Sequence, residues 1–314
     1  MIVCSRYRRG VSDDETPAGY HEMVAGYLDV ICDIYGGTGP LQPRLMHGQF
    51  HDVVLTGEVA YRFPRDEESR QQLARHTEVL AALARLRLPF AVPGPVSKVD
   101  AGQPLGRCHA ALRQLPGESL LPDQVPALDA RAIADQLAGL LDSLRQAGMD
   151  PAVAAAVEPA DPDSWHQFAA DVGDVLFPLM SQDGRRRAAA ELSSVQALDP
   201  AGPALAHTDL GGTNLLWDLD GPLPRLTGVI DWDGAQLGSQ AADLASLAVS
   251  FGWPVAERVD ALRHRGMRPD MDAARVIAAT FALQQALPAA LSGDTVMLAD
   301  GLATYGYPVT EDGS

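Results

Sequence analysis

Lysine is nearly absent from this chain of 314 residues, in which Lys98 is the only one. The sequence therefore holds no Gly-Lys-Ser or Gly-Lys-Thr step. A phosphate-binding loop of the Walker type depends on such a lysine, which contacts the β- and γ-phosphates of a bound nucleotide. A nucleotide-binding fold of the Walker type is therefore excluded.

Cysteine and long apolar runs are also scarce. The three cysteines, Cys4, Cys32 and Cys108, are odd in number and far apart, which favours neither a disulfide framework nor a zinc site. No run approaches the roughly 18 to 20 apolar residues that a membrane helix needs. The first ten residues lack the apolar core of a secretory signal. We expect a cytoplasmic protein.

Positive charge is the third scarcity. Lys and Arg total 24 against 41 Asp and Glu, which gives a formal net charge of -17. Such a surface repels nucleic acid and anionic membranes, and it attracts small cationic substrates. Acidic surfaces also occur for solubility alone, so charge supports a cationic substrate without establishing one.

What the sequence does contain is a polar loop between two short β-type runs. Residues 204–206 lead into His207-Thr208-Asp209-Leu210-Gly211-Gly212-Thr213-Asn214, and Leu215-Leu216-Trp217 follow. After a turn at 220–222, the apolar run 226–230 ends at Asp231-Trp232-Asp233-Gly234. One carboxylate and one carboxamide thus lie five residues apart, with a second carboxylate after the next strand.

These residue types suit phosphoryl transfer to an alcohol. Such a reaction needs a carboxylate that orients and deprotonates the hydroxyl, and Mg²⁺ held by hard oxygen ligands. Asp209 is the predicted base, while Asn214 and Asp231 are the predicted metal ligands. The glycines at 211 and 212 would let the loop turn back toward Asp209, with His207 packed beneath it as a brace. The alternative is an ordinary hairpin with polar turn residues.

The joint pattern H-x-D-x-x-x-x-N followed by I-D-W resembles the aminoglycoside phosphotransferase family, which belongs to the protein-kinase-like superfamily. The loop of that family reads roughly H-G-D-x-x-x-x-N followed by I-D-W. A narrower likeness is to the tuberactinomycin phosphotransferases, which act on the cyclic peptides viomycin and capreomycin. The segments that carry the likeness are 47–51, 177–181, 207–212 and 281–287. The resemblance implies an α+β, two-lobed fold, with a β-rich nucleotide-binding lobe over residues 1–115 and a mainly helical lobe over 116–314.

For the first lobe, we expect an N-terminal tail to about residue 18 that is poorly ordered, a helix over 20–35, and three strands within 41–63. The loop at Gly48 would cover the phosphates of ATP or GTP. In the family that this sequence resembles, a basic residue on the third strand, usually lysine, contacts the α- and β-phosphates. Arg62 occupies that position here. A helix over 66–86 follows, and our register puts His76 where the family has the glutamate that pairs with this lysine.

The short apolar run 108–112 leads into a predicted hinge at 113–117, where adenine would meet backbone near Leu112 and Gln114. Beyond it, the periodicity predicts helices over 127–147, 164–180 (with Ser164 as the cap), 184–198, 240–251, 255–265, 271–291 and 296–305. Asp243 matches an aspartate of the family pattern G-D-P-x-x-D-L. We expect it to cap its helix and to tie back the catalytic loop.

The carboxylates that we consider for a cationic substrate are Asp161, Asp163, Asp233, Asp270 and Asp272. Each has the alternative of a helix cap or a solvated surface charge. The combined prediction is an antibiotic phosphotransferase that uses ATP or GTP and Mg²⁺ and acts on a tuberactinomycin. The alternatives are an aminoglycoside, a macrolide or a small metabolite as substrate, and a kinase-like binding protein without turnover.

Overall fold

The computed structural model describes residues 20–35, 43–48, 50–120, 124, 129–264 and 269–307. The predicted disorder of the N-terminal tail concerns residues outside these ranges. The chain divides into two compact units. The sheet unit holds the described residues up to Leu120 together with Leu215–Asp233, and the helical unit holds those of Leu121–Asn214 and Gly234–Ser314.

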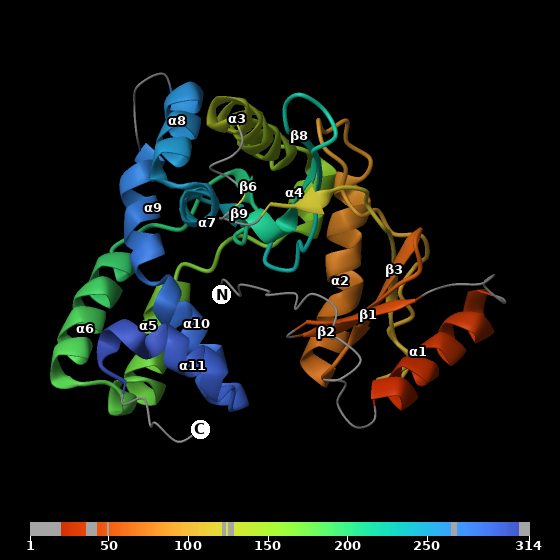
Figure 1. Cartoon of the computed structure of the whole chain (residues 1–314), viewed down its shortest axis with the longest axis horizontal. Coiled ribbons are helices and arrows are strands. Elements are labelled where there is room, and N and C mark those ends of the chain that lie inside the picture. The colour runs from red at the N-terminus through yellow and green to blue at the C-terminus, as the bar shows by residue number, and fades with distance from the viewer. Residues whose placement is uncertain are drawn as a thin grey trace. The chain divides into compact units, whose positions relative to one another are not determined.

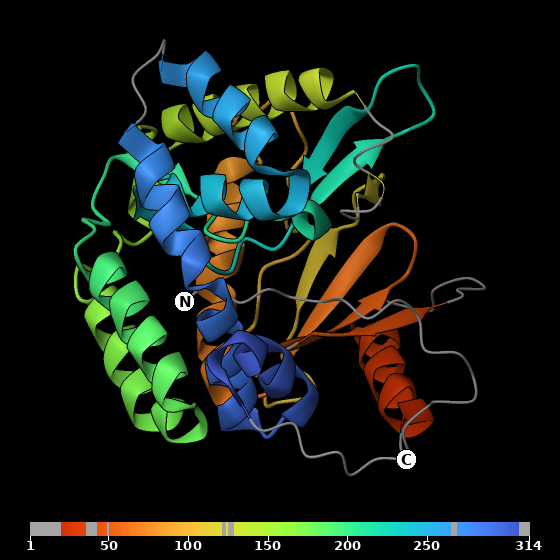
Figure 2. The same ribbon diagram turned by 60° about the vertical axis from the view of Figure 1, so that its left-hand side comes forward.

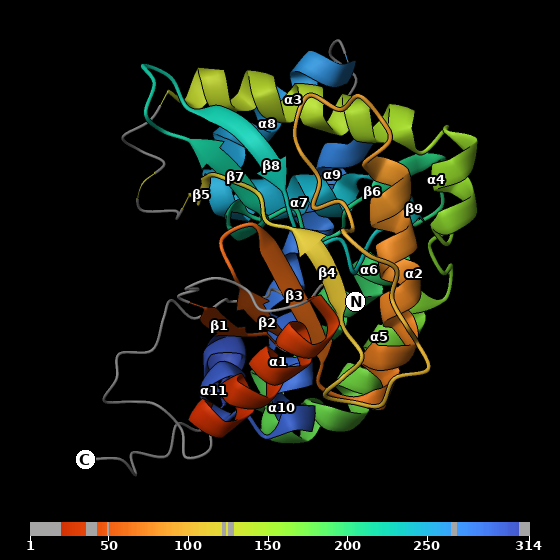
Figure 3. The same ribbon diagram turned by 90° about the vertical axis from the view of Figure 1, so that its right-hand side faces the viewer.

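The sheet unit is built on four antiparallel strands in the order β1-β2-β3-β4. Their bounds are Arg44–His47, His51–Leu55, Val59–Pro64 and Ala110–Arg113. Because side chains alternate along a strand, Val54, Tyr61 and Phe63 share one face, where they pack on Val30 and Ile31 of α1 (Tyr20–Tyr35). Arg62, which pairs with Val53, points to the other face. Figures 1 and 3 show α1 and α2 on opposite faces of this sheet.

Helix α2 runs over Glu67–Leu83, and its boundaries follow from its sequence. The Asp66 side chain accepts a hydrogen bond from the Ser69 N–H at 2.7 Å, while Glu67 and Glu68 occupy the first turn, where the helix dipole favours negative charge. A second sheet, β5-β7-β8 (Glu118–Ser119, Leu215–Asp218 and Arg225–Val229), completes this unit.

The helical unit begins with α3 (Ala130–Ala147). One face of this helix is apolar and buried, and it comprises Ile133, Leu137, Leu140, Leu141 and Leu144. Short α4 (Pro151–Ala156), α5 (Ser164–Val175) and α6 (Gln182–Gln196) follow. Figure 2 shows α5 and α6 side by side. The predicted helix over 164–180 is too long, because Pro178 follows α5 and residues 177–179 form a 3-10 turn. Its N-cap is Asp163 rather than Ser164.

Two strands, β6 (Ala204–Ala206) and β9 (Gln236–Gly238), pair antiparallel in the helical unit. The remaining helices are α7 (Ala241–Phe251), α8 (Trp253–His264), α9 (Pro269–Ala279), α10 (Phe281–Ser292) and α11 (Thr295–Leu302). The single helix predicted over 271–291 is therefore two helices that meet at Thr280.

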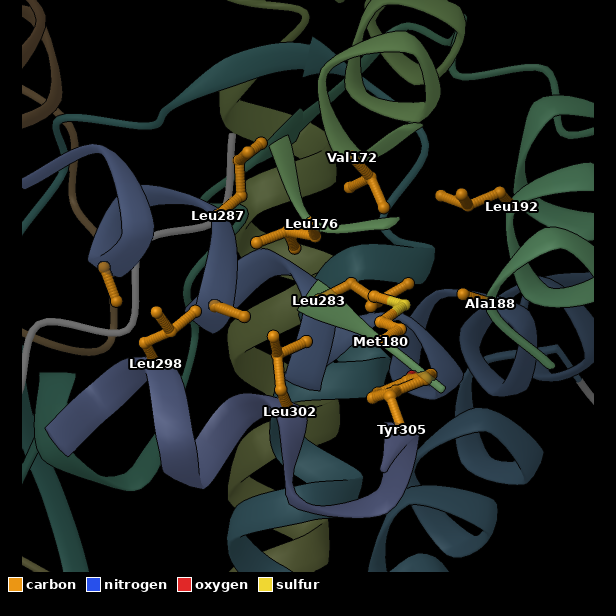
Figure 4. Close-up of a cluster of buried hydrophobic side chains, with 12 residues drawn as sticks. Val172, Leu176, Met180, Ala188, Leu192, Leu283, Leu287, Leu298, Leu302 and Tyr305 are labelled. Carbon is orange, nitrogen blue, oxygen red and sulfur yellow. The ribbon is translucent and has the colours of Figure 1, made fainter. Parts of the chain in front are cut away.

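The apolar centre of the helical unit draws on segments far apart in the sequence. Figure 4 shows Val172, Leu176 and Met180 packed with Leu283, Leu302 and Tyr305. By length and hydropathy, one stretch of the described residues, Asp270–Ser292, could cross a membrane. It comprises α9 and α10, and its side chains Leu283 and Leu287 belong to this buried cluster. That packing is typical of core helices.

Candidate active site

The loop between β6 and β7 brings Asp209 and Asn214 together. Residues 212–214 form a 3-10 turn, and neither Gly211 nor Gly212 has a positive φ. The Asn214 side-chain amide donates to the Asp209 backbone oxygen at 2.8 Å and to Asp209 Oδ2 at 3.0 Å. The amide therefore fixes the orientation of the carboxylate.

Asn214 is fully buried, and its Oδ1 has no hydrogen-bond partner among the described residues. A buried amide oxygen left in this state costs free energy unless something binds it. The other half of the same amide is occupied by Asp209, so the free oxygen lies next to a carboxylate. Hard oxygen donors in such a pairing suit Mg²⁺.

Asp243 anchors the start of the catalytic loop. It is fully buried and accepts hydrogen bonds from the backbone N–H groups of His207 at 3.1 Å and Thr208 at 2.7 Å. Burial raises the pKa of the Asp243 carboxyl to about 7, against the lowering effect of those two donors. The predicted tie to the loop is present, but the predicted cap is not: Gln240 is the N-cap of α7, and the Ser239 hydroxyl accepts from the Ala241 N–H at 3.2 Å. His207, the predicted brace, is fully buried.

Thr208 has an unusual backbone conformation that sequence reasoning missed. Its φ is +71°, a region that β-branched residues rarely adopt. Its hydroxyl donates to the Gly234 oxygen at 2.9 Å, and a Cβ at Gly234 would lie 2.4 Å from that hydroxyl. The family pattern H-G-D has glycine at this position, and that glycine was the available signal.

In the sheet unit, Arg62 lies at the centre of a polar cluster. Its Nη1 donates to Asp233 Oδ1 at 2.9 Å and its Nη2 to Asp233 Oδ2 at 2.5 Å. The same Nη2 lies 3.1 Å from His51 Nδ1 and 3.7 Å from Asp231 Oδ1. His76 Nδ1 lies 3.4 Å from Asp233 Oδ1. Asp233, which we expected to face the substrate, therefore has an arginine as its partner.

The pKa values of this cluster follow from its geometry. Burial alone would raise the pKa of Asp233, but Arg62 and His76 hold it well below its usual value. Burial, assisted by the charge of Arg62, lowers the pKa of His51 to about 3. At neutral pH the cluster thus contains an ionised Asp233 and a neutral His51.

Asp231, a predicted metal ligand, follows β8 and has a φ of +64°. The next residue, Trp232, is 2% exposed, and its indole N–H donates to the Val229 oxygen at 3.0 Å. A non-glycine residue is held in this conformation only when its surroundings fix it. The buried indole supplies that constraint.

The turn at Gly48 is tight. The Gly48 N–H donates to the His51 oxygen at 2.9 Å, and a Cβ at Gly48 would lie 2.8 Å from that oxygen. Arg65 Nη1 donates to the Gly48 oxygen at 2.9 Å. The predicted loop over 47–52 is shorter than expected, because β2 already starts at His51.

At the predicted hinge, backbone groups are already engaged. The Gln114 N–H donates to the Glu58 oxygen at 2.8 Å, and Leu112 pairs with Ala60 in the sheet. The side-chain oxygen Oε1 of Gln114 is buried and has no hydrogen-bond partner among the described residues. The hydrogen bonds at this position therefore leave the Gln114 side-chain oxygen available to accept from a ligand.

The other acidic candidates lie at helix starts in the helical unit. Asp161 and Asp163 precede α5, where Asp161 Oδ1 accepts from the Asp163 N–H at 2.9 Å. Asp270 and Asp272 occupy the first turn of α9. Asp270 lies 4.0 Å from Arg263, and the Asp272 side chain is 97% exposed. The helix dipole alone is a sufficient reason for carboxylates at these positions. Their role in binding the substrate therefore stays a prediction.

Comparison with solved structures defines the fold. The kanamycin and GDP complex of the aminoglycoside phosphotransferase APH(2")-IIia has a TM-score of 0.78 at 20% identity, covering 89% of this chain and 96% of that one. The macrolide 2'-phosphotransferase MphH of Brachybacterium faecium has a TM-score of 0.64 at 22% identity, covering 90% and 98%. The fold is the two-lobed, kinase-like fold of these enzymes, with a β-rich part and a mainly helical part.

Sequence comparison gives the family. A model of the phosphotransferase enzyme family matches residues 49–277. The viomycin phosphotransferase of Streptomyces vinaceus is 39% identical over 259 residues, which cover 82% of this chain and 90% of that protein. The chain belongs to the phosphotransferase enzyme family, as the loop motif predicted.

Proposed function

We propose that this protein moves the γ-phosphoryl group of ATP or GTP to a hydroxyl of a cationic cyclic-peptide antibiotic of the tuberactinomycin type, and so confers resistance. The observation that carries the reaction is the contact of Asp209 with Asn214, whose Oδ1 is left without a partner among the described residues. The observation that supports the substrate is the 39% identity to a viomycin phosphotransferase.

In this proposal Asp209 orients the substrate hydroxyl and takes its proton as the oxygen attacks the γ-phosphorus. The bond between the γ-phosphorus and the β–γ bridging oxygen breaks, and the nucleoside diphosphate leaves with that electron pair. Asn214 holds the Asp209 carboxylate in place. Asp243 holds the loop backbone, since it accepts from two of its N–H groups.

Asn214 and Asp231 are the proposed ligands of Mg²⁺. The buried Asn214 Oδ1, which has no partner in the described part of the chain, and the carboxylate of Asp231 are the hard oxygen donors that this ion prefers. When bound, Mg²⁺ neutralises charge on the β- and γ-phosphate oxygens. Gly48, Arg62, Leu112 and Gln114 are the proposed nucleotide contacts, with Gln114 Oε1 toward the base and Arg62 toward the phosphates.

The net charge of -17 supports a cationic substrate. Asp161, Asp163, Asp270 and Asp272 are the carboxylates proposed to hold it, all from the helical unit. A macrolide carries little positive charge and fits this surface less well. In the same proposal the protein acts in the cytoplasm, without nucleic acid or membrane as partner.

The test is mass spectrometry of the full-length protein incubated with Mg²⁺, ATP or GTP, and separate antibiotics. Viomycin and capreomycin are each expected to gain one phosphoryl mass, whereas kanamycin, erythromycin, homoserine and choline are not. A gain on kanamycin or erythromycin alone would replace the proposed substrate by that class. No gain on any compound, with nucleotide bound, would favour a binding protein without turnover.

A further inference from the structure

Arg62 is held by a carboxylate that comes from a distant part of the chain. It is 9% exposed, and its two Nη groups meet the two oxygens of Asp233, 171 residues away. This bidentate arrangement fixes the plane of the guanidinium as well as its position. A buried guanidinium without such a partner would be strongly unfavourable.

His51 adds a second constraint on the same group. Arginine has donors only, so His51 Nδ1 must accept from Arg62 Nη2, which lies 3.1 Å away. The imidazole is then neutral and carries its proton on Nε2. That geometry agrees with the burial of His51, which is 4% exposed. Arg62 is therefore held on two sides, by Asp233 and by His51.

Asp233 also connects the strand to the helix. Its Oδ1 lies 3.4 Å from His76 Nδ1 on α2, so one carboxylate lies against both the β3 cation and the α2 side chain. By our register His76 stands where a glutamate would pair with the strand cation. Here the negative charge comes instead from the Asp-Trp-Asp segment, whose first aspartate lies 3.7 Å from the same guanidinium.

We propose that Asp233 is a positioning residue. It holds the Arg62 guanidinium in the orientation that meets the nucleotide phosphates, with His76 and His51 as supports, and it does not bind the antibiotic. This inference rests on the proposed function, because the contact of Arg62 with phosphate is part of that proposal. It also implies that the strand cation and the proposed metal ligand Asp231 are positioned together, since Asp231 and Asp233 flank the same buried tryptophan.

The test uses Asp233→Asn in the full-length protein. Binding of ADP with Mg²⁺ is measured by titration calorimetry, and KM is measured separately for ATP and for viomycin. We expect the Kd and KM of nucleotide to rise about tenfold or more, the scale of a lost charged hydrogen bond, while the KM for viomycin stays unchanged. The matched control is Asp183→Asn, whose side chain is 83% exposed, and it should behave like wild type.

A rescue variant separates positioning from mere folding. Adding His76→Glu to Asp233→Asn returns a carboxylate to the α2 side of Arg62, and we expect most of the nucleotide affinity to return. If Asp233→Asn does not fold, Arg62→Lys takes its place. That variant keeps the charge but loses the bidentate pair, so nucleotide Kd should rise in the same way.

Two results would overturn the inference. One is nucleotide binding at wild-type strength in Asp233→Asn, or in Arg62→Lys where that variant replaces it. The other is a raised KM for viomycin with unchanged nucleotide Kd, which would make Asp233 a substrate contact. Absence of viomycin phosphorylation by the wild-type protein would instead contradict the proposed function, and the nucleotide Kd values would still decide the role of Asp233.

Discussion

At the scale of single residues, Thr208 shows how strain is balanced inside the catalytic loop. A Cβ at φ +71° is unfavourable, while the hydroxyl of the same residue donates to the Gly234 oxygen. Alanine would keep the Cβ and lose the hydrogen bond, whereas glycine would lose both. We therefore expect Thr208→Ala to be less stable than Thr208→Gly by about 1 kcal/mol.

Urea denaturation of the two variants measures that difference. An alanine variant as stable as the glycine variant, or more so, would show that the positive φ is not retained in solution.

His51 gives the protein a pH-dependent stability. Its pKa is about 3 in the folded protein, against an ordinary value of 6.5 for an exposed imidazole. Above pH 6.5 the imidazole is neutral in both the folded and the unfolded chain. Below it the unfolded chain binds a proton that the folded chain excludes, so the free energy of unfolding falls as pH decreases toward 3.

Lowering the pH from about 7.5 to about 5.5 should reduce the free energy of unfolding of the wild type by roughly 1 kcal/mol more than that of His51→Gln. The glutamine in that variant cannot be protonated. Denaturation of both proteins at the two pH values measures this. Equal pH dependence in the two would contradict a neutral, buried His51.

At the scale of elements, the contact between α10 and α11 depends on a glycine. A Cβ at Gly301 would lie 2.8 Å from the Ala282 oxygen and 2.9 Å from the Ala286 Cβ. Gly301→Ala should therefore destabilise the protein by about 1–3 kcal/mol. Gly139 in α3 is the control, because a Cβ there meets nothing within 4 Å. Gly139→Ala should stabilise by up to about 1 kcal/mol.

The midpoints of thermal unfolding of Gly301→Ala and Gly139→Ala, compared with wild type, test these two predictions. If the two alanine substitutions shift the midpoint in the same direction, the packing described for α10 and α11 is incorrect.

The elements also show what the sequence can and cannot predict. Helix α1 and the start of α2 were predictable because periodicity and capping residues are local signals. The break at Thr280 was not. Its hydroxyl donates to the Ile277 oxygen at 2.7 Å, whereas Pro288, a residue type that often breaks helices, lies inside α10. Buried packing, which a local pattern does not encode, decided between these positions.

The same distinction holds for the site. The contact of Asp209 with Asn214 was predictable because they lie only five positions apart and the loop chemistry is specific. The partner of Arg62 was not, because 171 residues separate it from Asp233 and many carboxylates would have satisfied the charge equally well. The resemblance showed that a glutamate was missing, but only the folded chain shows which group replaces it.

At the scale of the whole molecule, the net charge of -17 should act on substrate capture. Salt screens attraction between a cationic drug and an acidic surface. Raising NaCl from about 0.05 to about 0.5 M should lower kcat/KM for viomycin at least about threefold, with little change in kcat. Steady-state kinetics at the two salt concentrations tests this prediction. A kcat/KM that does not depend on salt would contradict the argument from net charge to a cationic substrate.

The measurement that tests the central claim most directly compares wild type with Asp209→Asn in phosphorylation of viomycin. Transfer is followed by mass spectrometry, and nucleotide Kd is measured alongside. We predict that the rate of transfer falls at least about 100-fold, the scale of a positioned general base, while nucleotide Kd stays unchanged. Equal rates in the two proteins would contradict the account of Asp209 as the catalytic base.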